Sequence, residues 1–337
     1  MTEVHVENEE QSEYRTITIT ESDRETFKRL DQFLNHAITD FSRTFIKNLF
    51  EKGEISLLES PNPTQKLELK KMPVAGTVIE VHLPPPMPAE AQAENIPLEI
   101  LYEDEHLVIV NKPQGMVTHP APGNYTGTLV NAILYHCKDI QGVGDQKRPG
   151  IVHRLDKGTS GVMVVAKTQK CHEGLVLLFS THDIERYYEA LIMGARVEKH
   201  GRLESQIGRD PHNRLKMSAN VRNGKKAITF YHLIQQYPTF AHVEFKLETG
   251  RTHQIRVHST ELLKRPLLMD PLYGHPKEHI LRMGTDYQEL LSNCEHPFLH
   301  AKILGFVHPI TREKLRFEVP PPKIFQDILT IANAPKV

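Results

Sequence analysis

Apolar positions in residues 25–83 recur at the spacings of two helices followed by short strands. The first set, spaced i, i+3, i+4, i+7 and i+8, forms one face of a helix: Leu30, Phe33, Leu34, Ala37 and Ile38. A second helix is predicted to begin after Ser42, a residue type that caps helix N-termini, and to end at Gly53. Alternating residues at 54–58 and 77–83 indicate strands. The pattern predicts a small helical domain that ends in strands.

The segments on either side of this domain have a different character. Residues 1–24 begin with five Glu before Tyr14 and are expected to form an acidic, flexible leader. Residues 84–95 combine four prolines with Ala, Glu and Gln, a composition typical of an extended linker. We therefore expect a second domain over residues 96–332.

The second domain shows more strands than helices. Two apolar runs at 98–102 and 107–110 flank an acidic turn, which is typical of a hairpin. Further strands are predicted at 162–166, 188–192, 227–234 and 242–247, and helices at 128–135, 171–180 and 252–263. Because the helices intervene irregularly, we expect an α+β fold with a mixed, largely antiparallel sheet flanked by helices.

Composition excludes several classes of protein. The chain is 39% hydrophobic and 25% charged, as in globular proteins, and no apolar run approaches the ~20 residues of a membrane helix. Its acidic start is unlike a signal peptide, so we expect a cytoplasmic protein without a membrane partner. The three cysteines are far apart, and the twenty histidines show no HExxH spacing, so no disulfide framework and no metal cofactor are expected.

Basic residues are concentrated although the formal net charge is −1. Residues 196–232 hold nine Lys or Arg against three acidic residues, which is either a solvated charged face or a surface for phosphates. Arg43 and Lys47, four residues apart on the second predicted helix, repel each other unless an anion lies over them. Both features favour a nucleic-acid partner.

A polar loop at residues 153–161 directly precedes a predicted strand. Its glycines permit unusual backbone conformations, and Thr159 and Ser160 are placed to donate hydrogen bonds to the Asp156 carboxylate. Taken alone, an Asp in such a turn is more often a turn cap. The loop is a candidate for chemistry.

A second cluster, at residues 248–258, runs from a strand through Gly250 into a helix. Arg251 and Arg256 oppose the dipole of a helix start, which indicates an acidic partner. His253 and His258 are five residues apart and so lie on different faces of a helix, which disfavours a metal site.

Several of these residues match known families. The N-terminal set resembles the S4 domain, an RNA-binding module: Arg29, Leu30, Asp31, Ser42, Arg43, Ile46, Lys47 and Gly53. Nearly the whole chain resembles the RluA class of pseudouridine synthases, most closely the branch that modifies large-subunit ribosomal RNA. The motifs are Lys112, Pro113 and Gly115; Arg154 to Asp156 with Thr159 to Gly161; Arg186, Tyr188 and Ala190; and Gly250 to Arg256. Met269 replaces a glycine of the family, so we expect a different local turn there.

The resemblance implies a role for each matched residue. Asp156 is the expected catalytic carboxylate, Tyr188 the ring that stacks on the target base, and Arg256 the partner of the carboxylate. Arg154 is expected to fill the space left by the flipped nucleotide. Further RNA-binding candidates are Thr159, Ile255, Lys112, Arg43, Lys47, Arg214 and Lys216.

The implied function is the isomerisation of uridine to pseudouridine in a stem-loop of large-subunit (23S) ribosomal RNA. The basic face favours a monomer. The reaction breaks the N1–C1′ bond and joins C5 to C1′, and it requires no nucleotide cofactor or other cofactor. Asp156 either attacks C1′ or removes the C2′ proton. Two alternatives remain. A non-catalytic assembly factor of the same fold would lack one of the three catalytic residues, and a glycoside hydrolase would require a second carboxylate.

Overall fold

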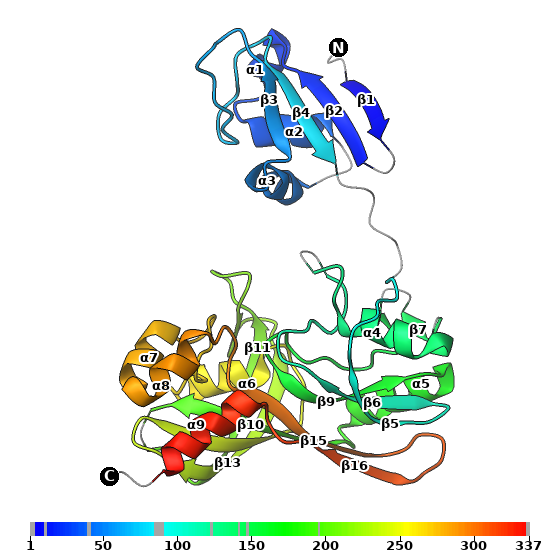
Figure 1. Ribbon diagram of the computed structural model, residues 1–337, viewed down its shortest axis with the longest axis vertical. Coiled ribbons are helices and arrows are strands. Elements are labelled where there is room, and N and C mark those ends of the chain that lie inside the picture. The colour runs from blue at the N-terminus through cyan, green and yellow to red at the C-terminus, as the bar shows by residue number, and fades with distance from the viewer. Residues whose placement is uncertain are drawn as a thin grey trace. The chain divides into compact units, whose positions relative to one another are not determined.

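The computed structural model describes residues 4–9, 12–38, 42–83, 91–121, 124–140, 142–145, 148–194 and 196–334 (Figure 1). The chain divides into two compact units, Met1–Pro88 and Ala89–Val337. This division falls inside the segment 84–95, where a linker is predicted, although residues 84–90 of that segment lie outside the described residues.

The N-terminal unit packs helices against a four-stranded antiparallel sheet. The strand order is β1-β2-β4-β3. The elements are β1 (Val4–Glu9), β2 (Ser12–Thr18), α1 (Glu21–Thr26), α2 (Leu30–Ala37), α3 (Arg43–Glu51), β3 (Ile55–Glu59) and β4 (Val78–Leu83). Both predicted helices are present, and the Ser42 hydroxyl accepts a hydrogen bond from the Phe45 amide at the start of α3. Phe33, Leu34 and Ile46 are buried in the core of this unit.

The expected flexible leader over residues 1–24 is wrong for the described residues. Strand β2 pairs with β4, and Ile17 and Ile19 are 0% and 1% exposed. Alternation places both isoleucines on the buried face of the sheet. Thr20 and Asp23 then form a capping box at the start of α1. The acidic composition obscured this short alternating run.

The second unit is built on one ten-stranded sheet in the described residues. Along the sheet the order is β12-β11-β13-β14-β10-β15-β9-β6-β5, with β16 beside β15. All pairs are antiparallel except β15 with β9, which confirms the predicted mixed, largely antiparallel α+β fold. The strands are β5 (Glu99–Glu103), β6 (Leu107–Lys112), β9 (Ser160–Ala166), β10 (Glu185–Met193), β11 (His200–Arg209), β12 (Met217–Ser218), β13 (Lys225–Gln236), β14 (Phe240–Leu247), β15 (Leu299–Val307) and β16 (Lys314–Glu318).

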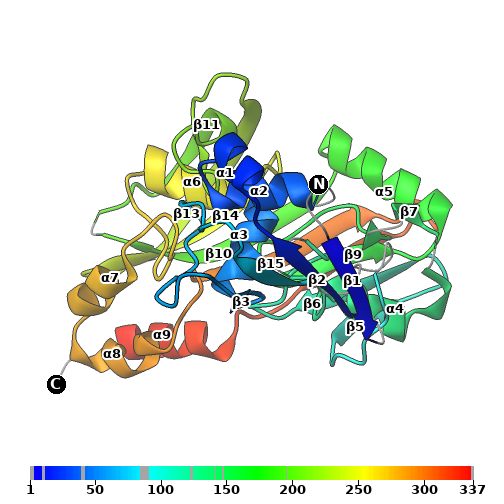
Figure 2. The same cartoon turned by 90° about the horizontal axis from the view of Figure 1, so that it is seen from above.

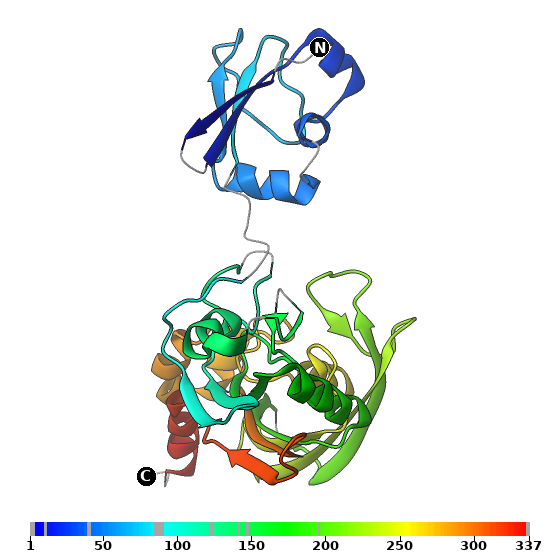
Figure 3. The same cartoon turned by 90° about the vertical axis from the view of Figure 1, so that its right-hand side faces the viewer.

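Helices flank this sheet in separate groups (Figures 2 and 3). They are α4 (Leu129–His136), α5 (Gln169–Thr181), α6 (Gln254–Val257), α7 (Pro276–Met283), α8 (Thr285–Ser292) and α9 (Lys323–Asn333). Helices α4 and α5 lie near β6 and β9, and α7, α8 and α9 lie together in a second group away from them (Figure 1). Helix α6 continues as a π-helical turn, His258–Leu262, so the predicted helix at 252–263 is present with a different geometry in its second half. In the described ranges, no helix is long and apolar enough to cross a membrane.

Candidate active site

A cavity of about 540 Å³ opens in the second unit between the loop before β9, the end of α5, strand β10 and the segment that leads into α6. Six of the predicted site residues line this cavity: Arg154, Asp156, Thr159, Tyr188, Ile255 and Arg256. They come from three segments that are far apart in the sequence. The fold therefore brings both polar clusters of the sequence together around one space.

The backbone that carries Asp156 is fixed by its close approach to the neighbouring strand. Gly161, the second residue of β9, has φ +120°, and a Cβ atom there would lie 2.1 Å from the Ala301 carbonyl oxygen. Only glycine tolerates both constraints. Two residues before Gly161, the Thr159 amide donates a hydrogen bond to the Asp156 carbonyl oxygen over 2.9 Å and closes a turn. The glycine thus places the Asp156 loop against β15.

One of the two side chains expected to hold the carboxylate has another partner. The Ser160 hydroxyl bonds the His300 ring over 2.9 Å, and no hydrogen bond joins Thr159 or Ser160 to the Asp156 side chain in the described structure. That expectation is therefore wrong: both residues are buried, at 2% and 3% exposure, and Thr159 lines the cavity without bonding the carboxylate.

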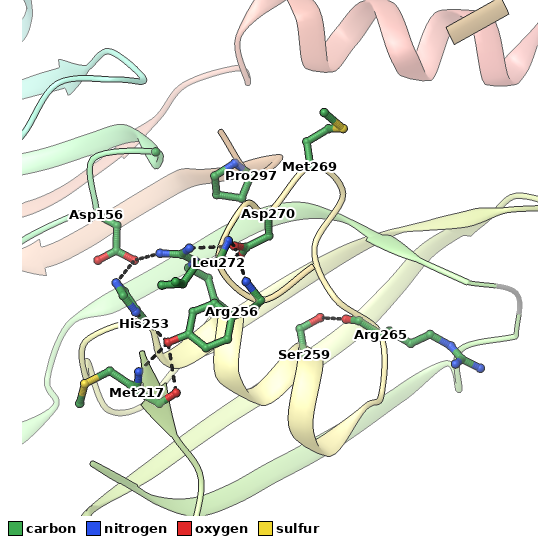
Figure 4. Close-up of polar contacts among 12 residues, drawn as sticks. Asp156, Met217, His253, Arg256, Ser259, Arg265, Met269, Asp270, Leu272 and Pro297 are labelled. Carbon is green, nitrogen blue, oxygen red and sulfur yellow. Dashed lines mark hydrogen bonds and ion pairs between the residues drawn. The ribbon is translucent and has the colours of Figure 1, made fainter. Parts of the chain in front are cut away.

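Arg256 holds Asp156 instead. Its Nη1 atom lies 3.5 Å from Asp156 Oδ2, while Nε and Nη2 each donate to Asp270 over 2.8 Å. Figure 4 shows Arg256 between the two carboxylates. Arg256 is 7% exposed and Asp270 is 0% exposed. The predicted Asp156–Arg256 pair is present, and a second carboxylate fixes the guanidinium from behind.

Asp270 is itself held by the backbone. Its Oδ1 atom accepts hydrogen bonds from the amides of Leu272 and Tyr273 over 2.9 and 3.0 Å. Burial acts to raise the pKa of Asp270, but the hydrogen bonds and the charge of Arg256 outweigh it, so the pKa lies below its ordinary value. Burial likewise acts to lower the pKa of Arg256, and Asp270 reverses that effect. Both groups are therefore charged.

His253 and Tyr273 complete this cluster. The His253 Nε2 atom lies 3.8 Å from Asp156 Oδ2, and its Nδ1 atom shares a 2.8 Å hydrogen bond with the Tyr273 hydroxyl. Burial lowers the pKa of His253, which favours the neutral ring at neutral pH. The Arg256 guanidinium lies 5.0 Å from the centroid of the Tyr273 ring, a cation–π contact. Asp156 thus faces one fixed cation and one neutral imidazole.

Tyr188 reaches the cavity from β10. Strand β10 pairs with β14 without a register shift, and the extra residue in its pairing with β15, Lys302, lies on β15, so the side chains of β10 alternate regularly through Tyr188. The residue is 9% exposed, and its side chain lines the cavity. Burial raises the pKa of the phenol, with Arg186 opposing and Asp156 adding to the effect, so Tyr188 keeps its proton at neutral pH.

Lys112 does not lie at the surface. It is 0% exposed, and its ammonium donates to the carbonyl oxygens of Pro113 and Met116 over 3.0 and 2.7 Å. Burial lowers its pKa to about 7, against the opposing effect of Asp156. The prediction that Lys112 binds RNA is therefore contradicted. Its two hydrogen bonds stabilise the turn after β6.

The remaining predicted RNA-binding residues lie outside the cavity lining. Arg214 is exposed between β11 and β12, and Lys216 places its ammonium 5.7 Å from the centroid of the Tyr273 ring. In the N-terminal unit, Arg43 pairs with Asp31 over 2.8 Å and Lys47 with Glu51 over 3.4 Å. The expected repulsion between Arg43 and Lys47 is thus relieved by carboxylates of the protein, although both side chains stay exposed.

Sequence reasoning missed the roles of Asp270, Tyr273 and His253. One signal was available, because two arginines at a helix start indicate an acidic partner. That partner was identified as Asp156 alone, whereas Arg256 makes its shorter contacts with Asp270. Next to Asp270, Met269 adopts φ +59°, the left-handed conformation that glycine takes most readily. The replacement of glycine therefore does not require a different turn.

In the described part of the chain, no three His, Cys, Asp or Glu side chains converge as ligands of one metal ion would.

Comparisons with known proteins agree with this geometry. Residues 106–261 match the RNA pseudouridylate synthase family. The chain is 42% identical over 315 residues to ribosomal large subunit pseudouridine synthase D of Zymomonas mobilis, which covers 90% of this chain and 95% of that protein. It is 40% identical to an uncharacterized RNA pseudouridine synthase of Bacillus subtilis, with 93% and 97% covered. A solved structure, human RNA pseudouridylate synthase domain containing 4, aligns with a TM-score of 0.53 at 25% identity, over 69% of this chain and 92% of that one. The chain therefore belongs to the RluA class of RNA pseudouridine synthases, which are isomerases.

Proposed function

We propose that this protein converts uridine to pseudouridine in large-subunit ribosomal RNA, with Asp156 as the catalytic carboxylate. The observation that carries the proposal is the cavity-lining Asp156, oriented by an arginine that Asp270 fixes from behind. The choice of RNA rests on relatives, from Zymomonas mobilis and Neisseria meningitidis, named as synthases of the ribosomal large subunit.

Asp156 serves the reaction by one of two routes. In the first, a carboxylate oxygen attacks C1′ and forms a glycosyl ester while uracil leaves with the N1 electron pair. In the second, Asp156 takes the C2′ proton and a C1′–C2′ double bond forms as uracil leaves. Arg256 holds the carboxylate in one orientation in both routes.

The other cavity residues bind the flipped nucleotide. Tyr188 offers an aromatic face on which the detached uracil can turn without leaving, and its phenol can take part in the final proton transfer. Ile255 and Thr159 complete the lining. Arg154 is exposed at the cavity and can fill the gap in the RNA stack, where unstacking costs a few kcal/mol.

The two alternatives fit the site less well. A non-catalytic RNA-binding factor has no need to assemble Asp156, Tyr188 and Arg256 around one cavity. A glycoside hydrolase needs a second free carboxylate, whereas Asp270 is fully buried and doubly bonded to Arg256.

A direct activity assay tests the function. We expect the purified protein to release tritium from large-subunit rRNA labelled at C5 of uridine, because the C5 proton is lost when C5 joins C1′. Release should continue after chelation of metal ions and without added nucleotide. The absence of release from any rRNA preparation, or activity that returns only with a metal ion, would contradict the proposal.

The N-terminal unit is proposed to be an S4-like RNA-binding domain that adds affinity rather than chemistry. Its exposed cations include Arg43 and Lys47, whereas all three catalytic candidates lie in the other unit. We expect deletion of Met1–Pro88 to weaken RNA binding about tenfold or more, because phosphate contacts supply most non-specific affinity. The single-turnover rate at saturating RNA should stay within about threefold of the full-length rate.

Circular dichroism must show that the shortened protein is folded. A folded truncated protein that binds RNA but has lost the chemical step would contradict this division of labour.

A further inference from the structure

Arg186 lies beside Tyr188 and has no role in the reaction as described so far. The two residues are two positions apart on β10, so their side chains project to the same face of the strand, and both line the cavity. Arg186 is 6% exposed. Its guanidinium lies 5.6 Å from the centroid of the Phe179 ring, and Phe179 lines the same cavity. The charge of Arg186 is therefore held next to the ring on which the base is proposed to stack.

Arg186 is a buried cation without a carboxylate partner in the described part of the protein. It makes one hydrogen bond, from Nη2 to the Glu248 carbonyl over 2.8 Å, and its buried Nε atom has no acceptor. Burial lowers the pKa of Arg186, Tyr188 opposes and Arg251 adds to the effect, yet a guanidinium remains charged at any ordinary pH. Arg256, by contrast, forms ion pairs with two carboxylates, those of Asp156 and Asp270. An unpaired buried cation is costly, which indicates that an anion occupies this space during function.

His153, which contacts Phe179 as Arg186 does, adds no second positive charge. The His153 ring stacks on Phe179 at 4.5 Å between centroids, and its Nε2 atom accepts a hydrogen bond from the Val164 amide. Burial lowers the pKa of His153 to about 3, and Arg186 adds to the effect, so the ring is neutral. His153 and Phe179 thus form an uncharged support for Arg186.

The reaction itself generates an anion at this place. When the N1–C1′ bond breaks, its electron pair stays on uracil N1 and is delocalised over O2 and O4. C1′ meanwhile gains the Asp156 ester bond or forms a double bond to C2′ as Asp156 takes the C2′ proton. When C5 joins C1′, the Asp156 ester bond breaks and frees the carboxylate or, in the second route, C2′ regains its proton from Asp156. The C5 proton is then lost and N1 is protonated, so the negative charge on uracil disappears. A buried cation beside the base is better placed to stabilise this transient anion than to bind a backbone phosphate, which stays hydrated.

We propose that Arg186 is a further catalytic residue, which donates to the uracil carbonyl oxygens and stabilises the uracil anion between the breaking of N1–C1′ and the formation of C5–C1′. This role rests on the proposed function. The interaction is stronger in the transition state than in the ground state, so it accelerates the chemical step more than it tightens binding.

The test compares Arg186→Gln, Arg186→Lys and the wild-type protein in two measurements, the dissociation constant for rRNA and the single-turnover rate at saturating RNA. We expect Arg186→Gln to lower the rate about 100-fold, the usual loss on removal of one preorganised donor, while the dissociation constant changes less than about threefold. Arg186→Lys keeps the charge but loses the planar fork, and we expect a loss of about tenfold. Arg282→Gln removes an exposed arginine on α7 that pairs with Glu278, and it is the matched control, expected to change neither the dissociation constant nor the rate.

A second substrate separates charge stabilisation from general damage to the site. Fluorine at C5 withdraws electrons and stabilises the uracil anion, so the defect of Arg186→Lys should shrink when 5-fluorouridine replaces the target uridine. The readout is the loss of the original nucleoside, measured by mass spectrometry of RNA digests. An equal defect on both substrates would overturn the proposal, even if Arg186→Gln did not fold.

The other outcomes are equally decisive. A wild-type rate in folded Arg186→Gln or Arg186→Lys would overturn the proposal, and so would weakened binding with an intact rate, which would identify a phosphate contact instead. A wild-type protein that forms no pseudouridine would reject the proposed function itself, whereas wild-type activity with unaffected variants rejects only the role of Arg186.

Discussion

Asp156→Asn is expected to reduce pseudouridine formation at least about 10³-fold in a single-turnover assay, because an amide neither attacks C1′ nor accepts the C2′ proton. The fold should survive. Arg256 keeps both of its 2.8 Å hydrogen bonds to Asp270, so the loss of the longer 3.5 Å contact with Asp156 leaves no unpaired buried charge. We expect the free energy of unfolding to change by less than about 1 kcal/mol.

RNA affinity should be retained in this variant, because most of it comes from phosphate contacts elsewhere. A matched control is Asp327→Asn on α9. This variant removes a partly exposed carboxylate that pairs with Lys323, and its rate should equal that of the wild type. A melting scan accompanies both variants. A folded Asp156→Asn protein with a near-normal single-turnover rate would refute the assignment of Asp156.

The elements with clear periodicity were predictable from the sequence. Helices α2 and α3 have apolar residues at helical spacing. The hairpin of β5 and β6 has an acidic turn between its two apolar strands. Strand β15 was missed because it lies in the middle of the sheet and is buried on both faces, so its residues do not alternate. Sequence pattern alone does not distinguish such a run from a buried helix.

Strand β11 was missed for the opposite reason. Its residues do alternate, with Leu203, Ser205 and Ile207 buried. The outward positions carry charges such as Arg202 and Glu204, which pair with each other, and the segment was interpreted only as a basic surface. The alternation in the sequence thus indicates a strand, but the interpretation considered only the number of charged residues.

Site residues that belong to a family motif could be predicted from the sequence. Residues that join the site only through three-dimensional contacts could not. The pairing of Asp156 with Arg256, one hundred positions apart, followed from family resemblance rather than from spacing. Asp270 and Tyr273 lie in a segment without a local signal of function, and only the fold brings them to Arg256. Lys112 was assigned to the RNA-binding surface because lysine is a residue type that is seldom fully buried, whereas this lysine is 0% exposed.

Asp270→Asn tests whether the buried carboxylate positions Arg256 and how much it stabilises the fold. The substitution leaves Arg256 buried with its charge only weakly compensated, since Asp156 lies 3.5 Å away. Removing one partner of a buried ion pair costs about 3 kcal/mol or more, and we expect a loss of that size in the free energy of unfolding, measured by urea denaturation at pH 7. Because a small displacement of Arg256 misaligns Asp156, the single-turnover rate should fall about 100-fold. Unchanged stability together with an unchanged rate would show that Asp270 does not position Arg256.

The pH dependence of stability gives a second, independent readout of Asp270. Its pKa in the folded protein lies below the ordinary value of 3.8, because the hydrogen bonds and charge of Arg256 outweigh burial, which acts to raise it. The stabilising contribution is therefore complete above the unfolded-state pKa and is lost as the pH falls through the lower, folded-state pKa. The wild-type protein should lose stability more steeply than Asp270→Asn below about pH 4, and the difference between the two proteins should narrow with further acidification. The other carboxylates titrate in both proteins, so the difference between the two urea series isolates Asp270. Parallel curves across this range would mean that the charge of Asp270 does not stabilise the fold through Arg256.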